Sequence, residues 1–222
     1  MLKKIVSFLF PLKIYTVKSA VSKSLEVTWV NGELVLDSEN TNYSYGSLQQ
    51  ILKHGLQAIG FEKIRKMDHV LLLGVAGGSI FKTLVDDIKF SGKLTGVEID
   101  SATIEIANQY FKLNEVPNLE IIIDDAFEYV LKTTAKYDLI VIDIFQDTNM
   151  PNFLFESFFT KRICFLLRNK GFVLFNTMIL DNKSNERNKK YLSDFNEADF
   201  SIRALPRVEQ HNELLIIENL NY

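Results

Sequence analysis

Short apolar runs in this 222-residue chain lead to residues that can bind or activate a small molecule. The run at 70–73 ends in Gly74-Val-Ala-Gly-Gly-Ser, and the next run ends at Glu98, 24 residues after Gly74. Gly74, Gly77 and Gly78 allow a sharp turn and the close approach of a ligand to the backbone. An acid at the end of the following strand can accept hydrogen bonds from both hydroxyls of a ribose. These residues predict a site for the adenosine part of a nucleotide-like cofactor.

The glycine turn departs from the pattern Gly-x-Gly-x-x-Gly of dinucleotide-binding proteins. Ala76 stands at the second glycine, where a pyrophosphate otherwise approaches the helix N-terminus. A cofactor without phosphates, either S-adenosylmethionine or its decarboxylated form, therefore fits better than NAD, and an NAD-type oxidoreductase is disfavoured. A tight strand–helix turn that binds nothing is the simpler alternative, and the acid at Glu98 argues against it.

Two further apolar runs also end in carboxylates, the third at Asp124 and Asp125 and the fourth at Asp143. In an open parallel sheet such strand ends line the ligand crevice. We expect Asp125 to lie near the adenine amino group, although one of Asp124 and Asp125 is expected to cap the following helix. Asp143 is predicted to lie beside a sulfonium centre, where a carboxylate can hold an acceptor amine and take its proton.

Tyr43 and Tyr45 belong to a polar loop that precedes these runs. Both tyrosines are candidates to cover the substrate site. Aromatic packing between an N-terminal module and the main domain is an equal alternative for the two rings.

Strands and helices alternate from residue 68 onwards, after a helix at 46–60, and this alternation positions the residues above. Helices are expected at 46–60, 78–90, 101–112 with Ser101 as N-cap, 125–132, 154–168 and 184–196. Strands are expected at 69–74, 93–98, 119–123, 137–142, 171–176, 200–206 and 213–218. The pattern predicts an α/β fold with a doubly wound, mainly parallel sheet, in which the closing strand pair makes one strand antiparallel.

Residues 1–45 are predicted to form a small N-terminal β-hairpin module, and residues 46–222 the main α/β domain. Residues 12–18 and 25–37 are rich in β-forming side chains, and Asn31-Gly32 marks a tight hairpin turn. The first ten residues combine a basic start with a short apolar run. That run is well below the roughly 20 residues that span a bilayer. A short amphipathic helix packed on the body or on a partner is expected there.

The whole-chain composition is that of a globular protein, with 47% hydrophobic residues and a net charge of −3. Without an overall basic excess, nucleic-acid and membrane partners are not expected, and we expect a cytoplasmic protein with a small-molecule partner. The single cysteine, Cys164, excludes an intramolecular disulfide and a cysteine zinc cluster. The histidines at 54, 69 and 211 lack metal-ligand spacing, so no metal is expected.

Several motifs together resemble the spermidine/spermine synthase family over about residues 25–180. They are Tyr-Ser-Tyr-Gly-Ser-Leu-Gln, Leu-Leu-Leu-Gly-Val-Ala-Gly-Gly-Ser, Gly-Val-Glu-Ile-Asp, Ile-Ile-Asp-Asp-Ala-Phe-Glu-Tyr-Val and Tyr-Asp-Leu-Ile-Val-Ile-Asp. The resemblance implies a seven-stranded, class I methyltransferase-like Rossmann fold that uses decarboxylated S-adenosylmethionine. It also implies nucleoside binding by Glu98 and Asp125, the catalytic aspartate position at Asp143, and a homodimer.

The chain departs from the family pattern where the family binds the amine. Gly77 stands at an aspartate of the family's glycine motif, and Gln146 stands at the second acid of Asp-x-x-Asp. The acid that usually follows the family's tyrosine is missing around residues 46–47. Each lost carboxylate weakens the binding of a polycation by roughly 1.5–3 kcal/mol. An acceptor other than putrescine is therefore predicted, and Gly77 is expected to leave room for a methionine carboxylate.

Two functions follow from the sequence. The first is a transferase that moves a methyl or an aminopropyl group from an S-adenosylmethionine-type cofactor to a small acceptor. The second is a nucleoside-binding or interaction protein that keeps the fold and has lost catalysis. The missing amine-binding acids favour the second, whereas Gly77, which leaves room and charge for a methionine carboxylate, favours the first.

Overall fold

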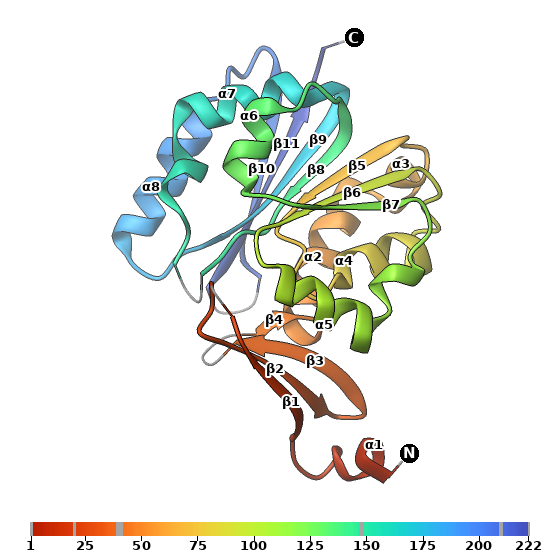
Figure 1. Cartoon of the computed structure of the whole chain (residues 1–222). Coiled ribbons are helices and arrows are strands. Elements are labelled where there is room, and N and C mark those ends of the chain that lie inside the picture. Colours follow the sequence, from red (N-terminus) through yellow and green to blue (C-terminus); the bar gives the residue numbers. More distant parts are fainter. Residues whose placement is uncertain (1, 20, 39–41, 147–148, 209–210, 222) are drawn as a thin grey trace.

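The chain forms two sheets that lie one above the other (Figure 1). A computed structural model describes residues 2–19, 21–38, 42–146, 149–208 and 211–221. The larger sheet has seven strands in the order β10-β11-β9-β8-β5-β6-β7, which confirms the predicted doubly wound sheet. Its strands are β5 (His69–Leu73), β6 (Lys93–Glu98), β7 (Leu119–Ile123), β8 (Tyr137–Ile142), β9 (Leu167–Met178), β10 (Phe200–Val208) and β11 (Asn212–Asn219).

Strand β5 lies at the centre of the large sheet and pairs in parallel with β6 and β8. Strand β11 runs antiparallel to both of its neighbours, β9 and β10. The closing pair therefore makes one strand antiparallel, as predicted. The carboxyl ends of β5, β6, β7 and β8 all point to the same edge of the sheet.

Helices cover both faces of the large sheet (Figure 1). Four lie on one face: α2 (Gly46–Ile59), α3 (Phe61–Arg65), α4 (Ser79–Lys82) and α5 (Ser101–Phe111). Three lie on the other: α6 (Ala126–Lys132), α7 (Ser157–Leu166) and α8 (Asn182–Ser193). Alternate residues of β5 serve the two cores, because Val70 and Leu72 face the first helix layer while Leu71 and Leu73 face the second. Each fully buried side chain of this size stabilises the fold by about 1.5–3 kcal/mol.

Two predicted helices are broken where the structure has one turn of a different helix type. The segment predicted as one helix at 78–90 is α4 followed by a π-helical turn at Thr83–Asp87. The Thr83 hydroxyl donates to the carbonyl of Ser79 at 3.1 Å, a local hydrogen bond that bends helices. The segment predicted at 154–168 is a 3₁₀ turn at Asn152–Phe155 followed by α7, and β9 begins directly after it.

The prediction of Ser101 as a helix N-cap is wrong, because Asp100 occupies that position. The Asp100 Oδ1 atom accepts the N–H of Ala102 at 3.0 Å, and the backbone of Asp100 is extended. An aspartate caps as well as a serine and adds a charge that favours the helix N-terminus.

The smaller sheet contains β1 (Leu12–Lys18), β2 (Ser24–Val30), β3 (Glu33–Ser38) and β4 (Asn42–Ser44), all antiparallel. The predicted Asn31-Gly32 turn joins β2 to β3, with φ of 50° and 80° at its two residues. Strand β4 was not predicted. Leu25 and Leu36 from this sheet pack against Phe111 of α5, so the small sheet rests on one helix of the main domain. A short helix, α1 (Leu2–Val6), precedes it.

Across the described ranges, no helix is long and apolar enough to cross a membrane.

Candidate active site

A cavity of about 480 Å³ opens at the carboxyl ends of the parallel strands. Four carboxylates at or just after the ends of three strands, β6, β7 and β8, line it: Glu98, Asp124, Asp125 and Asp143. Ser47 and Leu48 from the start of α2 and Val21 from the turn between β1 and β2 also line it. The cavity size falls within the range of small-molecule and cofactor sites.

Glu98 is buried and holds the glycine turn in place. Its Oε2 atom accepts the N–H groups of Val75 and Ala76, both at 3.0 Å, and its Oε1 atom accepts the N–H of Asp100 at 3.1 Å. Burial raises the pKa of the Glu98 carboxyl, and the three backbone donors act against that rise. A carboxylate has about four lone-pair positions, so one position remains for a ligand hydroxyl.

Asp125 caps α6 and lines the cavity at the same time. Its Oδ1 atom accepts the N–H of Phe127 at 2.7 Å. Asp124 accepts the N–H of Asp125 at 2.9 Å, which orients the pair. The two roles weighed in the sequence, helix cap and site residue, are therefore compatible in Asp125, because one carboxylate oxygen suffices for the cap.

Asp143 lies at the end of β8 and is held by a chain of two asparagines. The Asn176 amide donates to Asp143 Oδ1 at 2.9 Å, and the Asn212 amide donates to Asn176 Oδ1 at 2.9 Å. Asn176 is fully buried in β9, whereas Asn212 begins β11 and lines the cavity. Burial raises the pKa of Asp143 to about 6, with a smaller rise from the charge of Glu98 and an opposing effect of the Asn176 amide. This carboxyl therefore changes between its acid and base forms near pH 6.

The three glycines of the turn do different work. At Gly74 the φ is +88°, and a Cβ would lie 2.2 Å from the carbonyl oxygen of Asp143, so only glycine lets β5 pass so close to β8. At Gly78 the φ is +78°, and a Cβ would lie 2.5 Å from Leu113. Among the described residues that line the cavity, Gly74 and Ala76 are present, whereas Gly77 and Gly78 are not.

The expected space beside Gly77 is filled by the small sheet. A Cβ at Gly77 would lie 2.9 Å from both Cβ and Oγ of Ser44 and 3.1 Å from the ring of Tyr45. Ser44 is buried. The expectation that Gly77 leaves room for a methionine carboxylate is therefore wrong, because β4 of the N-terminal module occupies that volume.

Tyr45 packs between the module and the main domain. Its ring stacks on Phe111 of α5, with the ring centres 4.5 Å apart and the planes 15° apart. Burial, followed by the charge of Asp86, raises the pKa of its hydroxyl. The ring does not line the cavity, so this placement gives no support to a substrate contact by Tyr45. Tyr43 lies in β4, and its side chain lies outside the described residues.

The tip of the β1–β2 hairpin closes one side of the cavity. Gln146 donates its amide to the carbonyl of Val21 at 2.9 Å, and Ser19 donates its hydroxyl to Asp100 at 2.6 Å. Gln146 is the residue at the second family acid, and an aspartate there could not donate this hydrogen bond. At two of the places where the chain lacks a family carboxylate, Gly77 and Gln146, the N-terminal module makes a contact instead.

Sequence reasoning missed Asn176, Asn212 and the hairpin residues Ser19 and Val21. Asn176 gives a detectable signal, since a polar residue interrupts the apolar run of β9. The hairpin contacts have no local signal, because they join segments far apart in the sequence. No group of three His, Cys, Asp or Glu side chains suited to a metal ion occurs within the described ranges.

Comparison with known proteins identifies related sequences and folds. A sequence model described as the spermine/spermidine synthase domain matches residues 49–214. A polyamine aminopropyltransferase of Vibrio vulnificus is 27% identical over 135 residues, covering 60% of this chain and 45% of that protein. A Drosophila melanogaster homolog of the eEF1A lysine and N-terminal methyltransferase is 24% identical over 119 residues, covering 49% of this chain and 17% of that protein. The chain thus matches about half or less of the length of these relatives.

The fold is also that of solved transferase structures. A spermidine synthase crystallised with the transition state analogue AdoDATO superposes with a TM-score of 0.68 at 18% identity, covering 93% of this chain and 72% of that one. At this identity the likeness establishes the fold alone. The sequence model matches residues 49–214 and therefore leaves out the small sheet. The spermidine synthase structure covers 93% of this chain, more than the sequence model does.

Proposed function

The chain belongs to the spermine/spermidine synthase family, and we propose that it transfers an alkyl group from an adenosyl sulfonium cofactor to an amine nitrogen. The observation that carries this proposal is Asp143, a carboxyl with a pKa near 6 that lines the strand-end cavity. Both relatives bear names that describe transfer to amines, to a polyamine in one and to lysine or an N-terminus in the other. An amine is therefore the acceptor class that the two branches share.

The adenosine part of the cofactor is assigned to the β6 and β7 side of the cavity. Glu98 offers its remaining lone-pair position to a ribose hydroxyl, and Asp125 offers the carboxylate oxygen that does not cap α6 to the adenine amino group. Gly74 and Ala76 bring the backbone against the ligand. Gly77 and Gly78 contribute indirectly, because they allow the backbone conformation of the turn.

The charge of the lining favours the decarboxylated donor. The described residues that line the cavity include four carboxylates and no lysine, arginine or histidine. The methionine carboxylate of S-adenosylmethionine would enter this negative site without a cationic partner, whereas the decarboxylated form carries a positive charge at each of its two ionic groups. We therefore infer an aminopropyl donor ahead of a methyl donor.

The chemistry is a displacement at the carbon next to the sulfonium. The lone pair of the amine forms the new C–N bond, the C–S bond breaks, and its electrons neutralise the sulfur as a thioether. Asp143 holds the incoming ammonium and takes the proton that the amine must lose before or during attack. A carboxylate with its pKa raised to about 6 is a better base than an ordinary aspartate and is still largely ionised at neutral pH.

The acceptor side of the cavity is largely apolar. After Asp143, the wall continues through Ile144, Phe145, Pro151 and Met178. A diamine such as putrescine places a second ammonium group against such a wall at a high desolvation cost. The acceptor that fits is a primary amine with an apolar body, in keeping with the prediction that it is not putrescine.

The test is a turnover assay with two donors and three acceptors. S-adenosylmethionine and its decarboxylated form are each incubated with putrescine, 2-phenylethylamine and a lysine peptide, and mass spectrometry follows the alkylated amine and the thioether product. We expect alkylation of the apolar amine by the decarboxylated donor. Asp143→Asn should lower the rate by about 10²–10⁴-fold, the usual contribution of a general base. Asp68→Asn, an exposed carboxylate just before β5, is the matched control.

Product formation that survives Asp143→Asn unchanged would remove Asp143 as the base. If both donors bind and no amine is alkylated, the chain is the cofactor-binding protein without catalysis that the sequence leaves open as the alternative.

A further inference from the structure

The N-terminal segment 2–10 gathers exposed apolar side chains. Eleven large hydrophobic residues are exposed in the described part of the chain, and five of them lie in this segment: Leu2, Ile5, Phe8, Leu9 and Phe10. Leu9 is 83% exposed and Leu2 is 76% exposed, and α1 has no buried residue. The other six are scattered over the main domain. Single exposed apolar residues are ordinary, but a group of this kind marks a contact surface.

Polar bonds attach this segment to the small sheet and fix its outward face. Ser7 is buried, and its hydroxyl accepts the N–H of Gly32 at 2.9 Å while its carbonyl accepts the N–H of Asn31 at 3.0 Å. The segment is therefore held by the Asn31-Gly32 turn of the hairpin. The ring of Phe8 also lies against Gly32, yet each of the five apolar residues is more than half exposed. The segment lies at the end of the module farthest from the large sheet (Figure 1).

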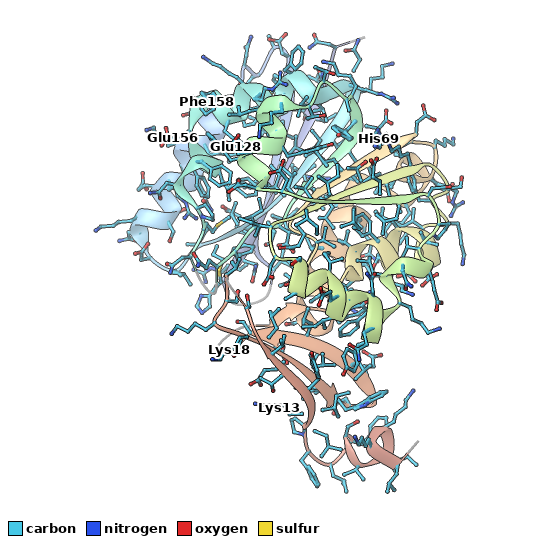
Figure 2. All side chains as sticks on the ribbon, viewed as in Figure 1. Lys13, Lys18, His69, Glu128, Glu156 and Phe158 are labelled. Carbon is cyan, nitrogen blue, oxygen red and sulfur yellow. The ribbon has the colours of Figure 1, made fainter. Side chains whose placement is uncertain are left out.

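The same part of the chain is strongly basic. Residues 2–23 contain five lysines and no aspartate or glutamate, whereas the whole chain has a net charge of −3. The lysines, all of them exposed, are Lys3, Lys4, Lys13, Lys18 and Lys23. One of them, Lys13, pairs with Glu26 of β2 at 2.6 Å. Lys13 and Lys18 project from the same side of the module (Figure 2). The whole-chain charge conceals this local excess.

We propose that segment 2–10 with its lysines is a peripheral docking surface for an anionic lipid bilayer. Exposed leucine and phenylalanine beside lysine is the composition of segments that lie in the bilayer interface, where apolar groups enter the acyl boundary and cations meet lipid phosphates. A second copy of the chain fits this surface less well, because segment 2–10 contains two lysines and no acid, so a symmetric contact of the segment with itself would be repulsive.

Vesicle flotation of the full chain tests the proposal. Vesicles of phosphatidylcholine containing phosphatidylglycerol are compared with vesicles of phosphatidylcholine alone. Each lysine near an anionic surface contributes about a fivefold gain in partitioning, so the double variant Lys3→Gln, Lys4→Gln should bind anionic vesicles roughly 25-fold more weakly. The double variant Lys66→Gln, Lys89→Gln removes the same charge from exposed positions of the main domain and should bind like the unaltered chain.

The apolar part is tested with Leu2→Ser and Leu9→Ser, each expected to lower vesicle binding by about tenfold or more. Leu180→Ser, an exposed leucine of the main domain, is their control. Equal binding to both kinds of vesicle, or no binding to either, overturns the proposal. Light scattering on the same samples measures the oligomeric state and so tests the alternative that a second copy of the chain covers this surface. If the chain is a dimer that Leu9→Ser makes monomeric, and vesicles do not bind, the surface is an interface between two copies.

Discussion

The strand-end cavity and the N-terminal segment differ in which side chains they shield from water. In the cavity, carboxylates such as Glu98 and Asp143 are withdrawn from water and held by amide donors of the protein. In segment 2–10, apolar side chains such as Leu9 are left in water. Each arrangement lowers the stability of the fold, and binding of a ligand or a partner would explain why it is kept. The comparison teaches that the molecule carries two separate surfaces prepared for something outside the chain.

The largest effect expected on the cavity side comes from Gly74→Ala. A Cβ there meets the Asp143 carbonyl at 2.2 Å and needs a φ of +88°, so we expect a loss of about 3–5 kcal/mol in the free energy of unfolding. Gly60→Ala is the control, because its φ is +111° while the nearest atom to a Cβ is 3.9 Å away. It should cost about 1–2 kcal/mol from backbone strain alone. Urea unfolding of both variants gives the comparison, and equal losses would show that the close strand contact is not what requires Gly74.

Asp143→Asn should stabilise the protein while it removes activity. The pKa of this carboxyl is raised from 3.8 to about 6, so between these values the folded chain holds a proton that the unfolded chain has released. The free energy of unfolding therefore falls as pH rises through this window, and the variant should gain about 3 kcal/mol above pH 6. Below pH 4 the gain should vanish. Urea unfolding at several pH values measures it.

Leu9→Ser provides the contrast from the other region. Because Leu9 is almost fully exposed, its replacement should change the free energy of unfolding by less than about 0.5 kcal/mol at any of these pH values. A large loss would mean that segment 2–10 is part of the folded core and not a docking surface.

An effect smaller than that of Gly74→Ala is expected where the module meets the glycine turn. Gly77→Ala places a Cβ 2.9 Å from the side chain of Ser44, which should cost about 1–3 kcal/mol. Adding Ser44→Gly should restore most of that loss, because the closest contacts are to the Ser44 side chain. A double-mutant cycle of thermal unfolding measures the coupling, and its absence would show that β4 does not fill the space beside Gly77.

The smallest effect is a shift in a pH profile. Asn176→Ala removes the amide that lowers the pKa of Asp143, so the ascending limb of kcat/KM should move to higher pH by about one unit. Asn219→Ala deletes another buried asparagine, whose amide donates to the backbone carbonyl of Arg168 at 3.1 Å. This variant should leave the ascending limb in place. If the ascending limb of kcat/KM does not move in Asn176→Ala, Asn176 does not influence the proton transfer by Asp143.

The main domain was predictable because its signals are local. The strands β6, β7 and β8 begin and end where the apolar runs do, because polar residues bound each run. The strands β6 and β8 are almost entirely buried, whereas β7 at the edge of the sheet is only partly buried. The acids at their ends follow from the same reading. The helix after the glycine turn was less predictable, because the apolar pattern does not distinguish an α-helical from a π-helical turn, and the π-helical turn begins at Thr83, whose hydroxyl donates to the carbonyl of Ser79.

The details of the site were not predictable, because they depend on contacts between distant segments. The role of Gly77 was misjudged since nothing near it in the sequence announces Ser44, which reaches it from β4. The environment of Asp143 depends likewise on Asn176 and Asn212, which belong to other strands. Local sequence patterns determine which residues reach the edge of the cavity. Tertiary packing determines how many hydrogen-bonding positions of each residue remain free for a ligand.

Calorimetric titration tests the central claim most directly, that the cavity is built for an adenosyl sulfonium compound with a cationic tail. The unaltered chain is titrated with decarboxylated S-adenosylmethionine, S-adenosylmethionine and NAD. Because the lining is acidic, we expect the decarboxylated compound to bind with a Kd below about 1 mM and at least about tenfold more tightly than S-adenosylmethionine, with no binding of NAD. Binding of NAD in the absence of binding by either sulfonium compound would contradict the account.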